Sequence, residues 1–141
     1  FWWYCREVHA MAKAEPIQAF LSSLLERIPG LRTILISDRE GIEITKAGEE
    51  LEDQDKNLGA VFANASLQVS KCGMGQNKTM TTFYKDRLVV HISHMPMVIS
   101  LIASEDANCG LMLSTADEIK QCIEPLRKYV GENVTFDTDV K

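Results

Sequence analysis

The side chains that could do chemistry are few, and their spacing favours neither a metal centre nor a nucleophile–base pair. Two of the three histidines, His91 and His94, lie three residues apart in or beside an expected strand. Odd separations place side chains on opposite faces of a strand, so these two imidazoles could not easily bind one ion. Cys109 has no histidine close to it in the sequence, so a His could reach it only through folding, and there is no G-x-S-x-G motif. The sequence therefore predicts no catalytic residue, no metal site and no cofactor.

A glycine pair, Gly73-x-Gly75 followed by Lys78, faintly resembles a phosphate-binding loop. A true phosphate loop follows a strand and leads into the helix whose N-terminus binds the anion. Here the glycines follow an expected helix and precede an expected strand. We interpret them as a helix cap and a tight connection.

Charge and hydropathy exclude two classes of partner. Carboxylates concentrate between residues 47 and 57, a run typical of a solvated loop. The formal net charge of the whole chain is -5, which disfavours binding to nucleic acid and to anionic membrane surfaces. No apolar run approaches the roughly 20 residues that a membrane helix needs. We therefore expect no nucleic-acid partner and no direct membrane insertion.

The four cysteines form no C-x-x-C pair and so give no zinc or redox signature. They are Cys5, Cys72, Cys109 and Cys122. We expect reduced thiols in a cytosolic protein, with the last three packed as small hydrophobic side chains.

The length of 141 residues suits one domain. We assign residues 11–131 to it and 132–141 to a polar C-terminal tail. Residues 1–10 (FWWYCREVHA) are expected to be an upstream or artificial extension, with Met11 as the natural start. The alternative is a native aromatic docking peptide.

Hydrophobic periodicity predicts an α+β fold with the element order α-β-β-α-β-β-β-α. The expected helices are 16–28, 58–72 and 115–130, and the expected strands are 31–37, 42–46, 77–84, 87–93 and 97–103. The last three strands form an antiparallel meander. The apolar runs Ile34–Ile36 and Met97–Ile102 predict central strands, and the Thr-rich run Thr79–Thr82 predicts an edge.

The third helix carries two further signals. Thr115 and Glu118 have the spacing of a capping box. Pro125 lies inside the helix and lacks an N–H group, so we expect either a kink or a late helix start there.

The second helix is unusually apolar, with no charge from Leu58 to Ser70. One stripe at helical spacing consists of Leu58, Val61, Phe62, Ala65, Val69 and Cys72, and a second apolar side consists of Ala60, Ala63 and Leu67. A helix that covers one sheet needs only one apolar stripe. Either the helix is buried on all sides within the monomer, or it forms a dimer interface. The edge strand that follows would offer unpaired backbone groups to a partner strand.

The chain resembles the roadblock-domain family. The element order carries the resemblance, together with the segments Leu31–Gly41, Gly73–Lys78, Pro96–Ser104 and Ala107–Leu111. Within that family the segments resemble the mitogen-activated protein kinase scaffold subunits of Ragulator (late endosomal/lysosomal adaptor) complexes. The resemblance covers about Pro16 to Val130, and Pro125 departs from the family pattern.

The resemblance implies a roadblock/profilin-like three-layer sandwich, with a five-stranded antiparallel sheet between one helix and two. It also implies a non-enzymatic adaptor that forms a heterodimer with a second roadblock-fold subunit through the second helix and the next strand. On this chain that surface would be Leu58, Val61, Phe62, Ala65, Val69, Lys78, Thr79, Met80, Thr81, Thr82 and Phe83.

The same resemblance implies further partners and a place in the cell. The partners would be other Ragulator subunits, the kinases MEK and ERK, and Rag GTPases in amino-acid signalling. The protein would be peripheral on the cytosolic face of late endosomes or lysosomes, held there by other subunits. Two alternatives stay open: a homodimeric roadblock module of another system, such as a dynein light chain or a GTPase regulator, and a small enzyme using Cys109 or the histidines.

Overall fold

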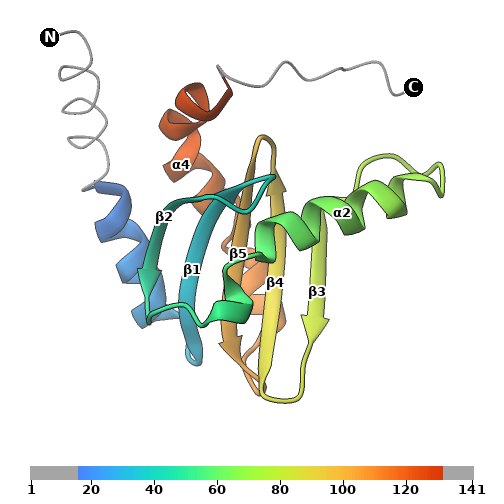
Figure 1. Ribbon diagram of the computed structural model, residues 1–141. Helices are drawn as coiled ribbons and strands as arrows, with labels where there is room; N and C mark the ends of the chain where they lie inside the picture. The colour runs from blue at the N-terminus through green and yellow to red at the C-terminus, as the bar shows by residue number, and fades with distance from the viewer. Residues whose placement is uncertain (1–15, 132–141) are drawn as a thin grey trace, which may run out of the picture.

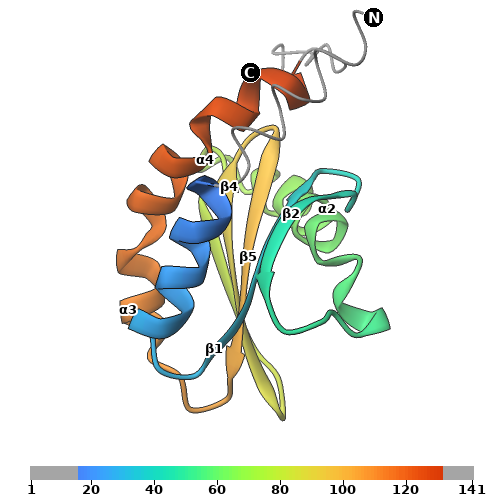
Figure 2. The same cartoon turned by 90° about the vertical axis from the view of Figure 1, so that its left-hand side faces the viewer.

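A computed structural model describes residues 16–131, and these form three layers (Figure 1). A five-stranded antiparallel sheet lies in the middle. Helix α2 (Leu58–Ser70) covers one face. The first helix, described over residues 16–27, lies on the other face with α3 (Cys109–Ser114) and α4 (Ala116–Gly131), as Figure 2 shows edge-on. The predicted α+β sandwich is confirmed.

The strand order is β2-β1-β5-β4-β3. The bounds are β1 Leu31–Asp38, β2 Glu43–Gly48, β3 Thr79–Phe83, β4 Arg87–His94 and β5 Met97–Ser104. The apolar runs in β1 and β5 are therefore interior, and the Thr-rich β3 is an edge, as predicted. The expected meander β3–β4–β5 is also present.

The two faces of the sheet bury different kinds of side chain. The face under the first helix, α3 and α4 belongs to the large apolar core, which includes Leu21, Ile36, Ile99, Leu101 and Ile123. Under α2 the apolar cluster is small and consists of Leu58, Val89 and Ile102, with Leu51 packed against it. Buried polar side chains share that side: His91 stacks on Phe62 of α2, and its Nδ1 lies 3.0 Å from Ser100 Oγ. The α2 layer is thus the thinner and more polar of the two.

Helix α2 approaches the sheet closely because Gly59 has no side chain. A Cβ at this position would lie 2.2 Å from Ser37 Oγ and 2.8 Å from the Asp38 carbonyl oxygen. Both distances are too short for real contacts, and backbone cannot move aside cheaply. Gly59 therefore fixes how the start of α2 sits on β1.

The C-terminal elements differ from the prediction in three ways. The segment after β5 forms the separate helix α3, whose N-cap Asn108 accepts a hydrogen bond from the Leu111 N–H. The expected capping box is wrong, because Thr115 donates to the Met112 carbonyl and Glu118 pairs with Arg27. A late helix start is also wrong, since α4 runs through Pro125.

Candidate partner interface

Helix α2 has a buried half and an exposed half. In its first five residues Leu58 and Phe62 are 7% and 0% exposed, and both pack on the sheet. Val61, in the same turn but on the other side of the helix, is 49% exposed, and Leu67 and Val69, further along, are 60% and 46% exposed. Neither of the two interpretations holds for the whole helix: its start belongs to the monomer's core, and its apolar remainder faces outward.

The exposed half of α2 extends past the margin of its own sheet. In Figure 1 the helix crosses β3 and continues beyond it, and the chain then turns back to begin β3. Asn77 of the returning segment donates to Ser66, but Leu67 and Val69 of the overhang stay exposed among the described residues. An apolar, charge-free helix end beside an open strand is typical of a surface for another protein.

The residues assigned to the pairing surface from the sequence therefore divide into two groups. Leu58 and Phe62 face the chain's own sheet, so their assignment to a partner contact is corrected. The apolar stripe did mark a buried side of the helix, but these two side chains are buried in the core of the monomer. The others remain at the surface: Val61, Val69, Lys78, Thr79 and Phe83 are exposed, and Ala65, Met80, Thr81 and Thr82 are half-buried. Helical periodicity alone could not tell which stripe faces inward.

The two edges of the sheet differ in how they are covered. At β2, the Gln18 side chain of the first helix donates to the Lys46 carbonyl oxygen and to Thr45 Oγ1 at 2.8 and 2.7 Å. For β3, no comparable bond from residues 16–131 reaches the backbone of its outer edge. Of the two edges, β3 is the open one.

The register identifies which backbone groups of β3 are open. Ser93 N–H donates to the Lys78 carbonyl, and Tyr84 N–H donates to the Arg87 carbonyl. Pairing in an antiparallel ladder alternates, so every second residue between them bonds to β4. The N–H and C=O groups of Thr79, Thr81 and Phe83 consequently point away from the sheet. These three residues form the open edge.

A buried ion-pair cluster holds the loop that leads into α2. Arg87, at the start of β4, is 8% exposed and donates to Asp55 at 2.7 Å and to Glu52 at 3.0 Å. The carboxylates of Asp86, Glu52 and Asp55 raise the pKa of Arg87 above its usual range, against the opposing effect of burial. Asp55 is only 6% exposed, so the expectation that the whole acidic run is solvated is wrong at this position. Sequence spacing gave no signal for this pair, because its members are 32 residues apart.

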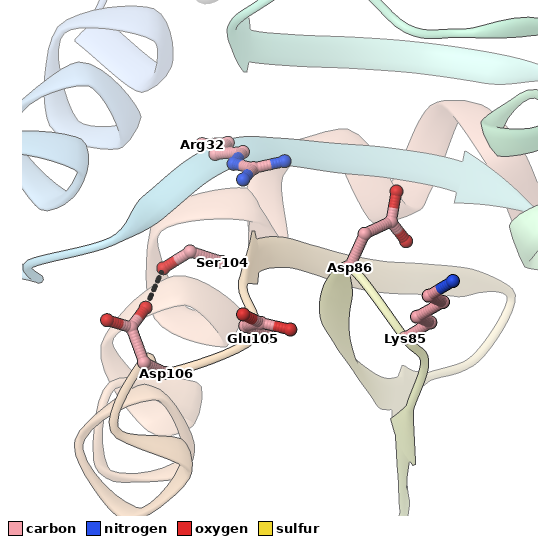
Figure 3. A pocket seen from close by; sticks show the side chains of 6 residues that line it. All are labelled: Arg32, Lys85, Asp86, Ser104, Glu105 and Asp106. Atoms are coloured by element: carbon pink, nitrogen blue, oxygen red, sulfur yellow. Dashed lines mark hydrogen bonds between the residues drawn. The ribbon is translucent and has the colours of Figure 1, made fainter.

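A surface recess of about 840 Å³ lies at the end of the sheet near the β3–β4 turn (Figure 3). Its side chains are two cations, three carboxylates and one hydroxyl, from Arg32, Lys85, Asp86, Ser104, Glu105 and Asp106. Ser104 donates to Asp106 at 2.8 Å, and Arg87 foremost lowers the pKa of Asp86. Among the described residues no histidine or cysteine lines the recess, and its one hydroxyl–carboxylate pair, Ser104 with Asp106, is exposed to solvent.

The other candidate chemical groups are dispersed across the fold. His91 lies under α2, whereas His94 pairs with Glu124 of α4 on the opposite side at 2.7 Å, as the odd spacing predicts. Cys109 and Cys122 are half-buried against the main core, but Cys72 is exposed, which corrects its expected packing. Within residues 16–131 no group of acidic, histidine and cysteine side chains could hold a metal. No helix of that part is long and apolar enough to cross a membrane.

Residues 15–130 match the family model described as "Mitogen-activated protein kinase kinase 1 interacting". The chain belongs to this family. It is 37% identical over 120 residues to the Ragulator complex protein LAMTOR3-B of Xenopus laevis, covering 83% of this chain and 98% of that protein. It is 35% identical to the human Ragulator complex protein LAMTOR3, covering 83% and 97%.

Solved structures show the same fold at low sequence identity. A roadblock/LC7 domain from Streptomyces avermitilis has a TM-score of 0.65 at 12% identity and covers 77% of this chain and 95% of that one. The gliding protein MglB from Thermus thermophilus has a TM-score of 0.68 at 13% identity, with coverage of 84% and 93%. The fold is therefore that of a roadblock domain. Family membership assigns this chain a scaffold or adaptor role in a non-enzymatic family.

Proposed function

We propose that this protein is the scaffold subunit of a Ragulator-type complex and that it forms a heterodimer with a second roadblock-fold subunit through the exposed half of α2 and the open edge of β3. The observation that carries the proposal is the overhang of a charge-free helix beside an edge strand with unpaired backbone. Burying the helix end removes apolar area from water, worth roughly 25 cal/mol per Å², and strand addition fixes the register.

In the same proposal the heterodimer docks further proteins. These are other Ragulator subunits, Rag GTPases, and the kinases MEK and ERK. The family description supports a MEK-type kinase as a partner, and the names of the relatives support other Ragulator subunits. Rag GTPases and ERK are proposed from the resemblance alone. The proposed location is the cytosolic face of late endosomes or lysosomes, reached through partner subunits.

The helix part of the surface is tested by Val69→Asp. A charge on the overhang would have to be desolvated at the interface, so we expect at least a tenfold loss of affinity for the second subunit, measured by calorimetry on purified chains. The matched control is Ile42→Asp, because Ile42 is a similarly exposed side chain (61%) in the turn between β1 and β2. Equal affinities of the two variants would contradict the helix surface. Phe62 is unsuitable for this test, since a charge there would disrupt the monomer's own core.

The strand part is tested by Thr81→Pro. Proline removes an outward-facing N–H without breaking the ladder with β4, so we expect the heterodimer Kd to rise by one to two orders of magnitude, about 1.4–2.8 kcal/mol. Thr81→Val is the control, because it removes the hydroxyl next to Cys109 Sγ but keeps the N–H. If the proline and valine variants bind equally well while circular dichroism shows both folded, the open edge is not where the partner pairs.

A further inference from the structure

A second recess lies beside the start of α2, and we infer that it receives an apolar side chain from the far end of the partner subunit's pairing helix. This inference rests on the proposed pairing through α2 and β3 and goes beyond it by naming a reciprocal contact. The recess measures about 190 Å³. Leu58 and Val89 line it, with Tyr84 beside them and Gln54 and Asp86 also among its residues.

The chemistry of this recess fits an apolar occupant. Leu58 and Val89 belong to the small apolar cluster under α2, and Tyr84 is 47% exposed. The charged side chains there are already neutralised within the chain, since Arg87 binds Asp55 and Asp86. An ionic ligand would have to displace these pairs, whereas an apolar side chain would only displace water.

Chain topology places the partner's helix end at this recess. In this chain the end of α2 lies near the start of β3, because Asn77 Nδ2, in the segment that joins them, donates to Ser66 Oγ at 3.2 Å. A partner with the same fold would carry its helix end in the same place. Two like edges related by a two-fold axis pair antiparallel. The start of the partner's strand then lies beside Phe83, where this β3 ends, and Tyr84 is the next residue. The partner's helix end must therefore come to rest next to Tyr84.

This chain carries a suitable apolar end for the reciprocal contact. Met74 follows α2 and is 85% exposed. It lies between Gly73 and Gly75, whose φ angles of 74° and 88° only glycine adopts readily. A Cβ on either glycine would touch nothing within 4 Å, so the backbone turn itself, and not close packing, requires them. The turn holds a flexible thioether side chain away from its own fold, at the tip that would reach the partner's recess.

Photo-crosslinking tests the contact directly in the full-length heterodimer. With p-benzoylphenylalanine in place of Tyr84, we expect crosslinks to the last turn of the partner's pairing helix or to the loop after it, mapped by mass spectrometry. The same probe in place of Ile42 should give none there. Crosslinks from position 84 to any other part of the partner, or none in a heterodimer that has formed, would overturn the inference.

Affinity gives a second readout that separates this inference from the proposed function. Tyr84→Ser and Met74→Ser should each raise the heterodimer Kd about tenfold, and Ile42→Ser should leave it unchanged. If Val69→Asp and Thr81→Pro weaken pairing but both serine variants bind as wild type, the reciprocal contact is refuted and the pairing stands. If the wild-type chains do not associate, both proposals fail together.

Discussion

Replacing Arg87 with methionine should lower the free energy of unfolding by roughly 3–5 kcal/mol, the usual cost of breaking a buried ion pair by removing one partner. Arg87 and Asp55 are both less than one-tenth exposed and their atoms are 2.7 Å apart. Without the guanidinium, Asp55 would remain as an uncompensated buried charge. Urea unfolding of the isolated chain, followed by circular dichroism, measures the loss.

A double-mutant cycle with Asp55→Leu separates the ion pair from packing. The double variant Arg87→Met/Asp55→Leu should regain much of the stability, because it leaves no buried charge. Lys56→Met is the matched control: Lys56 pairs with Asp53 at 3.0 Å, but both side chains are exposed, so its effect should stay below about 1 kcal/mol. An Arg87→Met variant as stable as this control would contradict a structural role for the cluster.

Lowering the pH from 7 to 4.5 should destabilise the fold through His91, by roughly 2–3 kcal/mol from this residue alone. Burial under α2 lowers the pKa of His91 from 6.5 to about 4. The folded state therefore keeps the imidazole neutral while the unfolded state takes up a proton. Stability from this source is fully present above pH 6.5 and is lost as the pH falls towards 4.

The control for this prediction is His91→Gln, which stays neutral at every pH and can still bond to Ser100. Other groups also contribute at low pH: hydrogen bonds lower the pKa of Glu124 through His94 and that of Asp86 through Arg87, and both carboxylates lose these contributions on protonation. They remain in the variant, so the difference between the two pH dependences isolates His91. If the free energy of unfolding falls by the same amount in wild type and His91→Gln between pH 7 and 4.5, His91 does not take up a proton on unfolding.

Destabilisation of this kind would act first on the layer that carries the partner surface. His91 stacks on Phe62 with ring centroids 5.4 Å apart, and its Nε2 has no hydrogen-bond partner among the described residues. The Ser37 hydroxyl beneath Gly59 is likewise unpaired. Unpaired buried polar groups reduce stability, so α2 is held less firmly than the helices on the apolar face.

Local pattern was sufficient for most of the fold. The apolar runs of β1 and β5, the Thr-rich β3 and the glycine-bounded helices are properties of short segments, because burial on one or both faces leaves a period in the sequence. The separation of His91 and His94 onto opposite faces follows from the same period. The N-terminal ten residues and the C-terminal tail, 132–141, lie outside the described residues, so their assignment stays a prediction.

Three features could be predicted from residue order: the sequence of elements, the family resemblance and the segment that is too apolar for one sheet. The three-dimensional packing was needed to show which side of that segment faces inward: Leu58 and Phe62 pack on the sheet, while Val61, Leu67 and Val69 are exposed. It also paired Arg87 with Asp55 and left β3 as the open edge. The helical period fixes only the angular positions of side chains about the helix axis. Which side meets the sheet, how far α2 extends past β3 and which carboxylate pairs with Arg87 depend on contacts between elements that are far apart in the chain.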